Sequence, residues 1–435
     1  MVRLILFQLF ALLLLPAAGQ AQLSAPERRA MRVVEAETDR HIALLERLVN
    51  QNSGTLNLAG VRAVADLLRP EFEALGMQVR WVDMGETGRA GHLIATHRGR
   101  GRASHILLIG HLDTVFEADS PFQLFTRQGD RATGPGTSDM KGGVVVMLAA
   151  LRALHQARLL SAMNVTIVLT GDEERPGSPI ATARRDLIAA GRDADYALEF
   201  EGLARSDGRD FATVARRGSA NWTLTTRGRT GHSSRVFSSE LGFGAIYEMA
   251  RILDSFRREL PEANLAFNVG VLAGGTPAAL DGQGLSVTAS GKTNIVAETA
   301  VARGDLRSLT PEQDQRIRAR MQEIVGRHLP QTSAELVFGE AGYPPMAPSP
   351  GNVALLGRLN AVNRDLGLPE MAAYDPAQRG AADSGFVARD VDTLGGMGAA
   401  GGRAHAEGEW IDLTSLPLQA KRAAILINRL SRAAR

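Results

Sequence analysis

Short apolar runs that alternate with helical stretches constrain the fold of this chain more than any other feature of its sequence. The runs HILLIG (105–110), NVTIVLTG (164–171) and DYALEF (195–200) are typical of strands, and helical stretches separate them, notably over 142–154. Strands that alternate with helices predict an α/β domain with a mostly parallel sheet and helices on both faces. In such sheets, binding sites lie at the carboxyl ends of the strands. The polar residues that follow each run are therefore candidate site residues.

The pattern changes near residue 212. The segment 211–232 alternates apolar and polar residues, as a half-exposed antiparallel strand does. A helix over 241–258, strands within 265–275 and 294–309, and a helix over 311–329 are expected to follow. We therefore predict an inserted α+β domain over 213–327, after which AELVFGE (334–340) resumes the first domain. Outside the insertion, further helices are predicted over 27–49, 58–75 and 416–432.

The first residues have the layout of a secretory signal. Arg3 precedes an apolar stretch over 4–15, and Pro16 and small residues lead to a plausible cleavage site after Ala21. A transmembrane anchor is the alternative, but the apolar stretch is too short to span a bilayer comfortably. We expect residues 1–21 to be a signal peptide, residues 22–212 and 328–435 to form the first domain, and the mature protein to be periplasmic or secreted without stable membrane association.

Composition excludes some functions and narrows others. The chain has 435 residues, more than a single core usually holds, which agrees with two domains. The formal charge of +2 and the lack of basic runs interleaved with aromatic residues give no indication of nucleic-acid binding. Cysteine is absent, so the chain has no disulfides and no thiolate ligands. Any metal must be held by His, Asp and Glu.

Histidines and acids gather at five places where strands end or helices begin. Each cluster alone has an ordinary explanation, such as a helix cap for Asp139, solvated turn acids for Glu173 and Glu174, or a surface histidine for His405. Burying them together is costly unless positive charge compensates them, and a pair of divalent cations would do so. The five clusters are GHLDTV (110–115), GPGTSDMKGG (134–143), TGDEERPGS (170–178), EFEG (199–202) and RAHAEGE (403–409).

In this order and context, the five clusters resemble the M20 family of zinc metallopeptidases, the group of glutamate carboxypeptidase, aminoacylase and succinyl-diaminopimelate desuccinylase. The resemblance covers nearly the whole chain after the signal. The insertion falls where this family has its dimerisation domain, often called a lid. The resemblance therefore implies a catalytic domain with two metals and a homodimer formed through residues 213–327.

The resemblance also implies the ligands of two Zn²⁺ ions, for which Co²⁺ or Mn²⁺ are possible substitutes. It assigns His111 and Glu201 to the first zinc, Glu174 and His405 to the second, and Asp139 to a bridge between them. Glu199 is the alternative to Glu201, because two residues apart they face the same way in an extended strand. The family usually has a cis peptide after the bridging acid, which here is Asp139-Met140.

Two carboxylates match catalytic roles. Asp113 would orient and polarise the ring of His111. Glu173 matches the catalytic base, although an acid with a purely structural role is the alternative. Two zinc ions lower the pKa of a shared water, which makes the metal-bridged hydroxide available as the nucleophile. Glu173 would take the proton of that water and later deliver it to the leaving amine.

Other matches concern the substrate. His232 in RTGHSS (229–234) matches a histidine that crosses the dimer to stabilise the oxyanion of the partner's site. Asn294 and Arg307 match residues that hold the free carboxylate of the substrate, a task that suits the planar guanidinium of arginine. The alternatives are an exposed strand-end histidine for His232 and a surface charge for Arg307.

The segment QRGAADSGF (378–386) resembles a Gly-Gly-x-x-Asp loop of the family, but Arg379 stands where many members have glycine. Gly380 would still offer backbone to the substrate carboxylate, and Asp383 would stabilise the loop. Arg379 is either a specificity residue or a structural partner of a nearby acid, and the sequence does not decide between them.

These expectations combine into an exported, homodimeric di-zinc hydrolase that acts on a peptide or an N-acyl amino acid. It would cleave the amide next to a C-terminal amino acid with a free carboxylate, as a glutamate carboxypeptidase does. An N-acyl-amino-acid deacylase or a dipeptidase is the alternative among enzymes. A catalytically silent homologue that binds amino acids or acts as a scaffold is the alternative from another class. The presence of every expected ligand and of the base argues against a silent homologue.

Overall fold

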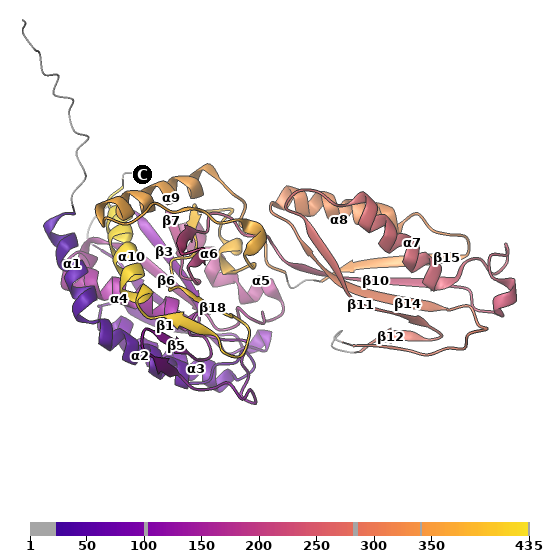
Figure 1. Ribbon diagram of the computed structural model, residues 1–435, viewed down its shortest axis with the longest axis horizontal. Helices are drawn as coiled ribbons and strands as arrows, with labels where there is room; N and C mark the ends of the chain where they lie inside the picture. Colours follow the sequence, from indigo (N-terminus) through magenta and orange to yellow (C-terminus); the bar gives the residue numbers. More distant parts are fainter. Residues whose placement is uncertain (1–22, 100–102, 282–285, 340–341, 434–435) are drawn as a thin grey trace, which may run out of the picture.

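The computed structural model describes residues 23–99, 103–281, 286–339 and 342–433, which form two domains side by side (Figure 1). The first domain is built on a six-stranded sheet, and the second on a four-stranded sheet. The expected signal peptide lies outside the described residues. No helix within the described ranges is both long and apolar enough to cross a bilayer.

The sheet of the first domain is parallel at its centre and antiparallel at one side. The strand β3 pairs in parallel with β6 and β7, and β7 pairs in parallel with β17, whereas β1 and β2 are antiparallel to their neighbours. Every residue of β3 is buried, as is usual for a central parallel strand covered on both faces. The strand order is β1 (Gln78–Asp83), β2 (Gly91–His97), β6 (Asn164–Thr170), β3 (His105–His111), β7 (Tyr196–Glu199) and β17 (Thr393–Leu394).

Helices cover both faces of this sheet, as predicted. Ile106 and Leu108 of β3 belong to a large core that includes α4 (Lys141–Gln156) and α10 (Ser415–Ser431). The alternate residues of β3 belong to a second, smaller core on the opposite face, where α6 (Arg185–Asp193) packs. The other long helices of the domain are α3 (Leu58–Glu73) and α9 (Pro350–Asp365).

The helix predicted over 27–49 is two helices. They are α1 (Ala25–Ala36), which begins with a capping box between Ser24 and Glu27, and α2 (Thr38–Asn50). Glu37 separates them, and its carboxylate accepts a hydrogen bond from Nε of Arg152 on α4 at 2.9 Å. Amphipathic periodicity continues across the break, which is why the sequence pattern did not reveal it.

The second domain is an antiparallel sheet with two helices, α7 (Gly244–Glu259) and α8 (Pro311–Val325). Its core is separate from that of the first domain, and Trp222, Phe256 and Met321 belong to it. Because the domain has its own core, it is an insertion of the predicted α+β type. Its strands, in sheet order, are β11 (Ala266–Gly275), β14 (Thr299–Arg307), β10 (Ala220–Gly228) and β15 (Thr332–Phe338).

The expectation that the first domain resumes at residue 328 is wrong. The strand β15 pairs with β10 along its whole length, from Thr332 opposite Gly228 to Phe338 opposite Trp222. A strand at the edge of an antiparallel sheet is buried on one face only, which gives β15 an alternating pattern that carries no information about its domain. The second domain therefore extends to Phe338.

Candidate metal centre and active site

Three adjacent parallel strands end at one edge of the large sheet and present polar side chains there. His111 is the last residue of β3, and it lies opposite Thr170, the last residue of β6. The acids Glu173 and Glu174 follow β6 by a few residues, and Glu201 follows β7. The carboxyl ends of neighbouring parallel strands meet at the same edge, so these groups come together although the chain separates them.

Asp139 and His405 reach the same edge on loops outside the large sheet. Asp139 lies between β5 (Arg131–Thr133) and α4, and His405 lies in the turn between β18 (Gly401–Gly402) and β19 (Trp410–Asp412). The strands β5 and β19 pair with each other, which ties the two loops together. The peptide bond between Asp139 and Met140 is cis, as expected.

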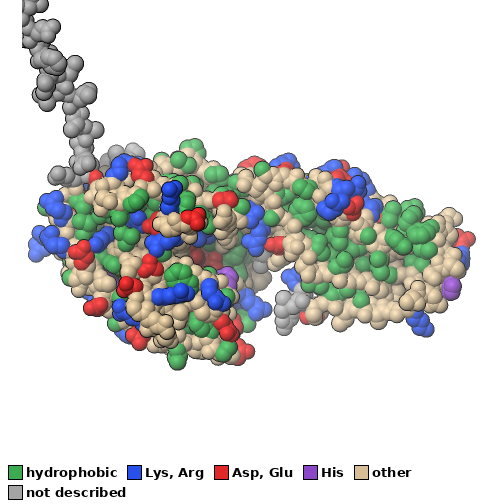
Figure 2. Space-filling model, viewed as in Figure 1, with side chains coloured by type: hydrophobic (Ala, Val, Ile, Leu, Met, Phe, Trp, Pro, Cys, Tyr) green, Lys and Arg blue, Asp and Glu red, His purple; other side chains and the backbone are tan. Residues whose placement is uncertain are grey.

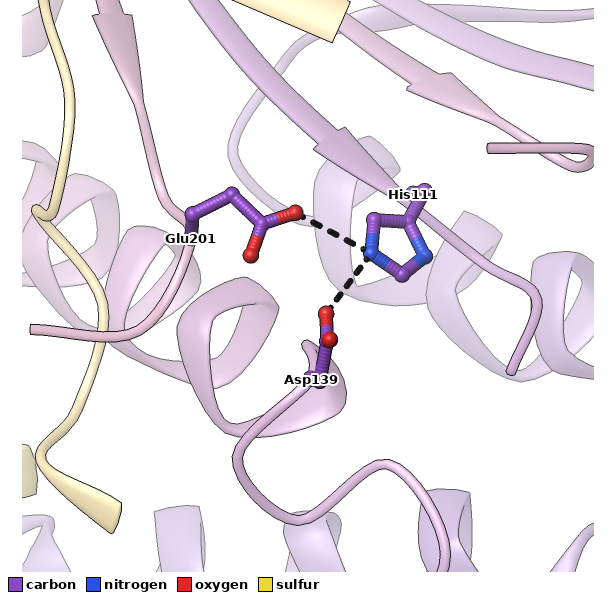
Figure 3. Close-up of side chains that lie close together, drawn as sticks. All are labelled: His111, Asp139 and Glu201. Atoms are coloured by element: carbon purple, nitrogen blue, oxygen red, sulfur yellow. Dashed lines mark hydrogen bonds and ion pairs between the residues drawn. The ribbon is translucent and has the colours of Figure 1, made fainter. Parts of the chain in front are cut away.

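The five predicted ligands form two triads that share Asp139. Nε2 of His111 lies 3.1 Å from Oδ1 of Asp139 and 3.2 Å from Oε1 of Glu201 (Figure 3). Nε2 of His405 lies 3.0 Å from Oδ2 of Asp139 and 3.1 Å from Oε2 of Glu174. In each triad the candidate ligand atoms lie within 4.8 Å of one another. The two oxygens of Asp139 thus face two different sites.

The donor set of each triad fits a divalent cation. Imidazole nitrogen and carboxylate oxygen are the ligands that Zn²⁺ accepts in the absence of thiolates. Oε1 of Glu174 is buried and has no hydrogen-bond partner among the described residues, so one oxygen at the centre is unsatisfied. Asp139 and then Glu174 raise the pKa of His405 to about 11 by hydrogen bonding. Groups that hold a proton on a histidine so firmly would also hold a cation beside the neutral ring.

The acids of this edge are costly to keep ionised together. Burial raises the pKa of Glu174 to about 7, and the charge of Asp139 adds to the effect. Burial is also the main cause that raises the pKa of Glu201, again with Asp139. Burial raises the pKa of Glu173 well above its usual value, and the charges of Glu174 and Glu201 act in the same direction. Two bound cations would compensate these charges.

Asp113 holds two parts of the site in place. Its carboxylate accepts the backbone N–H of Glu173 at 3.0 Å and that of Glu174 at 3.1 Å, together with the hydroxyl of Thr55 at 2.6 Å. Nδ1 of His111 lies 3.0 Å from the carbonyl oxygen of Asp113 and 3.4 Å from its carboxylate. Asp113 therefore orients the acidic turn as well as the histidine ring, which is more than the sequence suggested.

Glu173 belongs to neither triad but faces the same cavity. It lines a pocket of about 560 Å³ together with Asp139, Glu201 and His405. Its backbone carbonyl accepts a hydrogen bond from the hydroxyl of Tyr343. A carboxylate that is beside two candidate metal sites, and is not itself a member of either, is free to exchange protons with a bound molecule.

Glu409 is a positioning residue for which the sequence gave no role. It is 1% exposed and accepts the backbone N–H groups of Gly136 at 3.1 Å, Ser138 at 2.6 Å and Asp139 at 2.9 Å. These bonds fix the loop that carries the shared ligand. The only signal was its place in the cluster RAHAEGE, where another acid, Glu407, stands two residues earlier.

Glu199, the alternative to Glu201, has a different partner. Its Oε2 accepts Nε of Arg216 at 2.9 Å and Nη2 at 2.6 Å, and both side chains are buried. Glu201 is the acid that meets His111. Asp383 also has a structural place, because it accepts Nε of Arg184 at 2.7 Å and the hydroxyl of Thr170 at 2.6 Å, which joins its loop to the end of β6.

The substrate residues predicted in the second domain do not reach this pocket within one chain. His232 and Asn294 lie at one end of the second sheet, where the carbonyl of Asn294 accepts the N–H of Ser233 at 2.9 Å. Arg307 ends β14 at the opposite end of that sheet, and its Nε donates to Asp305 at 2.9 Å. None of the three lines the pocket of the two triads, whereas Gly380 does.

Comparison with known proteins gives the family of this chain. The model of peptidase family M20/M25/M40 matches residues 107–429. Carboxypeptidase G2 of Pseudomonas sp. (strain RS-16) is 25% identical over 425 residues, which cover 95% of each chain. A succinyl-diaminopimelate desuccinylase of Novosphingobium aromaticivorans is 28% identical over 311 residues, 69% of this chain and 76% of the relative.

Solved structures share the fold. The YXEP protein of Bacillus subtilis, described as a dinuclear metal binding peptidase from the M20 family, superimposes with a TM-score of 0.64 at 14% identity. The alignment covers 92% of this chain and all of that chain. The family match spans most of the sequence and includes every residue of the two triads. The chain therefore belongs to peptidase family M20/M25/M40, and it is an enzyme of the metallopeptidase and amidohydrolase type.

Proposed function

We propose that this chain is an exported, homodimeric di-zinc carboxypeptidase that releases a C-terminal amino acid with a free carboxylate, with an acyl or peptidyl glutamate as the leading substrate. One observation carries the proposal. Two triads of metal-binding side chains share Asp139, and Glu173 lies beside them outside either triad. The similarity to carboxypeptidase G2 extends over nearly the full length of both chains, which supports the choice of reaction.

The residues of the chain suit amide hydrolysis. Divalent cations, when bound, polarise the scissile carbonyl and lower the pKa of water. Glu173 accepts a proton on its carboxylate as the water oxygen bonds to the carbonyl carbon. It then donates that proton to the amine nitrogen as the C–N bond breaks. The carboxylate of Asp113 accepts the backbone N–H of Glu173, and this bond holds Glu173 in position.

The proposed homodimer has a surface that suits a second copy. The strand β11 is at the edge of the second sheet, and Leu272 on it is 54% exposed. Ile246 and Tyr247 at the start of α7 are 49% and 52% exposed, and Figure 2 shows apolar side chains gathered over this domain. An exposed apolar edge strand tends to pair with another chain. A second copy on this surface would supply the His232 and Asn294 that one chain keeps away from its own pocket.

A substrate panel tests the proposed reaction. The zinc-loaded protein should release amino acid from N-acyl and peptidyl glutamates, and it should not act on the same compounds when the free α-carboxylate is converted to an amide. Equal activity on the amides would contradict a carboxypeptidase. Metal analysis after dialysis should give two equivalents per chain for the wild type, and Asp139→Asn should lower the affinity for both.

The desuccinylase relatives support a second candidate. Because a succinyl-diaminopimelate desuccinylase is 28% identical over 311 residues, deacylation of an N-acyl amino acid is the alternative reaction. The panel separates the two, since a deacylase should prefer small acyl groups to peptidyl groups. A dipeptidase should require a free amino terminus. A protein that binds two metals and turns over no member of the panel would instead be a silent homologue.

Export is tested by fractionation. Expression of the full chain should yield periplasmic or secreted protein whose first residue follows Ala21. An intact first residue on cytoplasmic protein would contradict the signal peptide.

A further inference from the structure

Arg379 lies in the same pocket as the candidate metal centre. The pocket is lined by Arg379 together with Asp139, Glu201 and His405. Nη2 of Arg379 donates to the carbonyl oxygen of Gly202 at 3.0 Å, and Gly202 directly follows Glu201. The sequence motif that differs from the family pattern thus places a guanidinium next to the reaction site.

Within the described part of the chain, some N–H donors of this guanidinium have no hydrogen-bond partner. Arginine carries five N–H donors, and the carbonyl of Gly202 accepts only from Nη2. Nε of Arg379 is sealed from solvent and has no hydrogen-bond partner within the described part of the chain. No Asp or Glu of that part lies within ion-pair distance of Arg379. A buried cationic donor without a partner is costly, so its retention needs an explanation.

Arg216, a neighbouring arginine, has the contacts of a structural ion pair. Arg216 also lines the pocket, but Nε and Nη2 both bind Glu199, and Nη1 donates to the carbonyl of Gly380 at 3.0 Å. Glu199 is therefore already paired. Oδ1 of Asp139 and Oε1 of Glu201 face His111, and Oδ2 of Asp139 faces His405. The nearby acids have other partners, and Arg379 lines the cavity without an acidic partner among the described residues.

We propose that Arg379 is a specificity residue that binds a carboxylate of the substrate inside the metal pocket. A planar guanidinium pairs with a carboxylate through two parallel hydrogen bonds, which a neutral amide matches poorly. A side chain added at Gly380 would meet no atom within 4 Å, so the segment next to Arg379 leaves open space for a ligand. The inference rests on the proposed function and extends it, because it makes an acidic group a requirement for tight binding.

Two carboxylates could fill this role: the free α-carboxylate of the C-terminal residue, or a carboxylate on its side chain. The test compares wild type, Arg379→Gln and Arg379→Lys on three substrates. They are an N-acyl glutamate, the matching N-acyl glutamine, and the N-acyl glutamate whose α-carboxylate is an amide. Because the proposed reaction excludes cleavage of this amide, its arm is read as a dissociation constant in the Glu173→Gln background. Arg379→Gln should lower kcat/KM by about 10- to 100-fold for substrates that carry the carboxylate it contacts. The substrate that lacks this group should lose almost nothing, and Arg379→Lys should restore part of the loss.

If Arg379→Gln impairs both glutamate substrates and spares the N-acyl glutamine, Arg379 binds the side-chain carboxylate. If it impairs the two substrates with a free α-carboxylate and spares the α-amide, Arg379 binds the α-carboxylate. An equal loss on all three substrates would overturn the inference, because a structural role predicts it. The matched control is Arg217→Gln. Nη2 of Arg217 donates to the carbonyl of Ala377 in the same segment at 2.8 Å, and Arg217 does not line the pocket. This control should keep wild-type kinetics on all three substrates.

A binding measurement separates this inference from the proposed reaction. In the zinc-loaded Glu173→Gln background, calorimetry with an N-acyl glutamate should show a dissociation constant that rises about 10- to 100-fold when Arg379→Gln is added. An unchanged constant would overturn the role of Arg379 even if the wild type is an active carboxypeptidase. A raised constant would support it even if the wild type fails to cleave the substrate panel.

Discussion

The two domains of this enzyme differ in how completely a single chain builds its functional groups. In the first domain, four candidate metal ligands from four separate segments converge on the shared carboxylate of Asp139. In the second domain, His232 and Arg307 lie at opposite ends of one sheet and away from that pocket. The carboxyl ends of neighbouring parallel strands lie at one edge of the sheet, so residues from distant segments meet there. Residues at opposite ends of an antiparallel sheet stay separated by the length of its strands. The first arrangement needs only the fold, whereas the role proposed for His232 requires a second copy of the chain.

One ion pair from each domain shows how burial changes the strength of such a pair. Arg184 and Asp172 in the first domain are both fully buried and 2.6 Å apart. Arg318 and Asp314 in the second domain form an i,i+4 pair along α8 with side chains 29% and 23% exposed. Water and salt screen the second pair but hardly reach the first. Substitutions at these two pairs should therefore have effects of very different size.

The largest effect should come from Glu173→Gln. The substitution removes the proton acceptor without touching either triad, so kcat should fall by about 10²- to 10⁴-fold while zinc content and folding stay as in the wild type. Turnover assays with parallel metal analysis check this. Glu174→Gln is the matched control, because it should lower the zinc content. Activity retained in Glu173→Gln would remove this residue as the base.

Among the substitutions at ion pairs, the one at the buried Arg184 should lower the free energy of unfolding most. Arg184→Met leaves Asp172 and Asp383 buried without their cation, because Arg184 lies 2.6 Å from one and 2.7 Å from the other. We expect a loss of about 3–5 kcal/mol in the free energy of unfolding. Chemical denaturation measures it. A loss below about 1 kcal/mol would show that the buried network is no stronger than a surface pair.

His232→Ala tests whether the second domain acts on a partner. We expect kcat to fall by about 10²- to 10³-fold with zinc content and dimer mass unchanged, because an oxyanion donor is lost. Mixing this variant with Glu173→Gln, after subunit exchange, should restore activity, since one site of each hybrid dimer then has both groups intact. Random exchange should restore about a quarter of the wild-type sites. No recovery in verified hybrids would place His232 outside the partner's site.

His41 should make the first domain sensitive to mild acid. It lies on α2 and is 3% exposed, and burial lowers its pKa to about 4 from an ordinary value of 6.5. The unfolded chain therefore binds a proton before the folded chain does. Stability should fall as the pH drops from about 6.5 to about 4, and this contribution should be absent above that window. His41→Leu should reduce the fall by up to about 3 kcal/mol between pH 7 and pH 4, as measured by denaturation at each pH. Identical pH profiles for the two proteins would exclude His41 as the cause.

The smallest effect should come from Asp314→Asn in the second domain. The partly exposed pair with Arg318 at 2.6 Å and the favourable position in the first turn of α8 together contribute about 0.5–1 kcal/mol. The loss should shrink further in high salt. Denaturation at low and high salt checks this, and a loss as large as that of Arg184→Met would erase the contrast between the domains.

The sequence predicted more of the metal edge than of its surroundings. The clusters that contain His111, Asp139 and Glu201 were identifiable because each stands where an apolar run or a helix signal meets polar residues, and the family resemblance then singled out these three as ligands. The choice between Glu201 and Glu199 needed the structure, since both face the same way along the chain and only the position of Arg216 separates them. Glu409 acts through backbone N–H groups far away in the sequence, and no local pattern reveals such bonds.

Local periodicity determined which segments are helices and strands, and the chemistry of His, Asp and Glu without cysteine determined that a metal here takes nitrogen and oxygen ligands. Only the tertiary structure decided that β15 completes the second sheet, that Glu37 divides the first helix, and that Arg379 lines the pocket with its Nε unpartnered among the described residues. The physical reason is the range of the interactions. Side-chain periodicity is set by neighbours along the chain, whereas strand partners and ion pairs are set by whichever distant segments fill the same space.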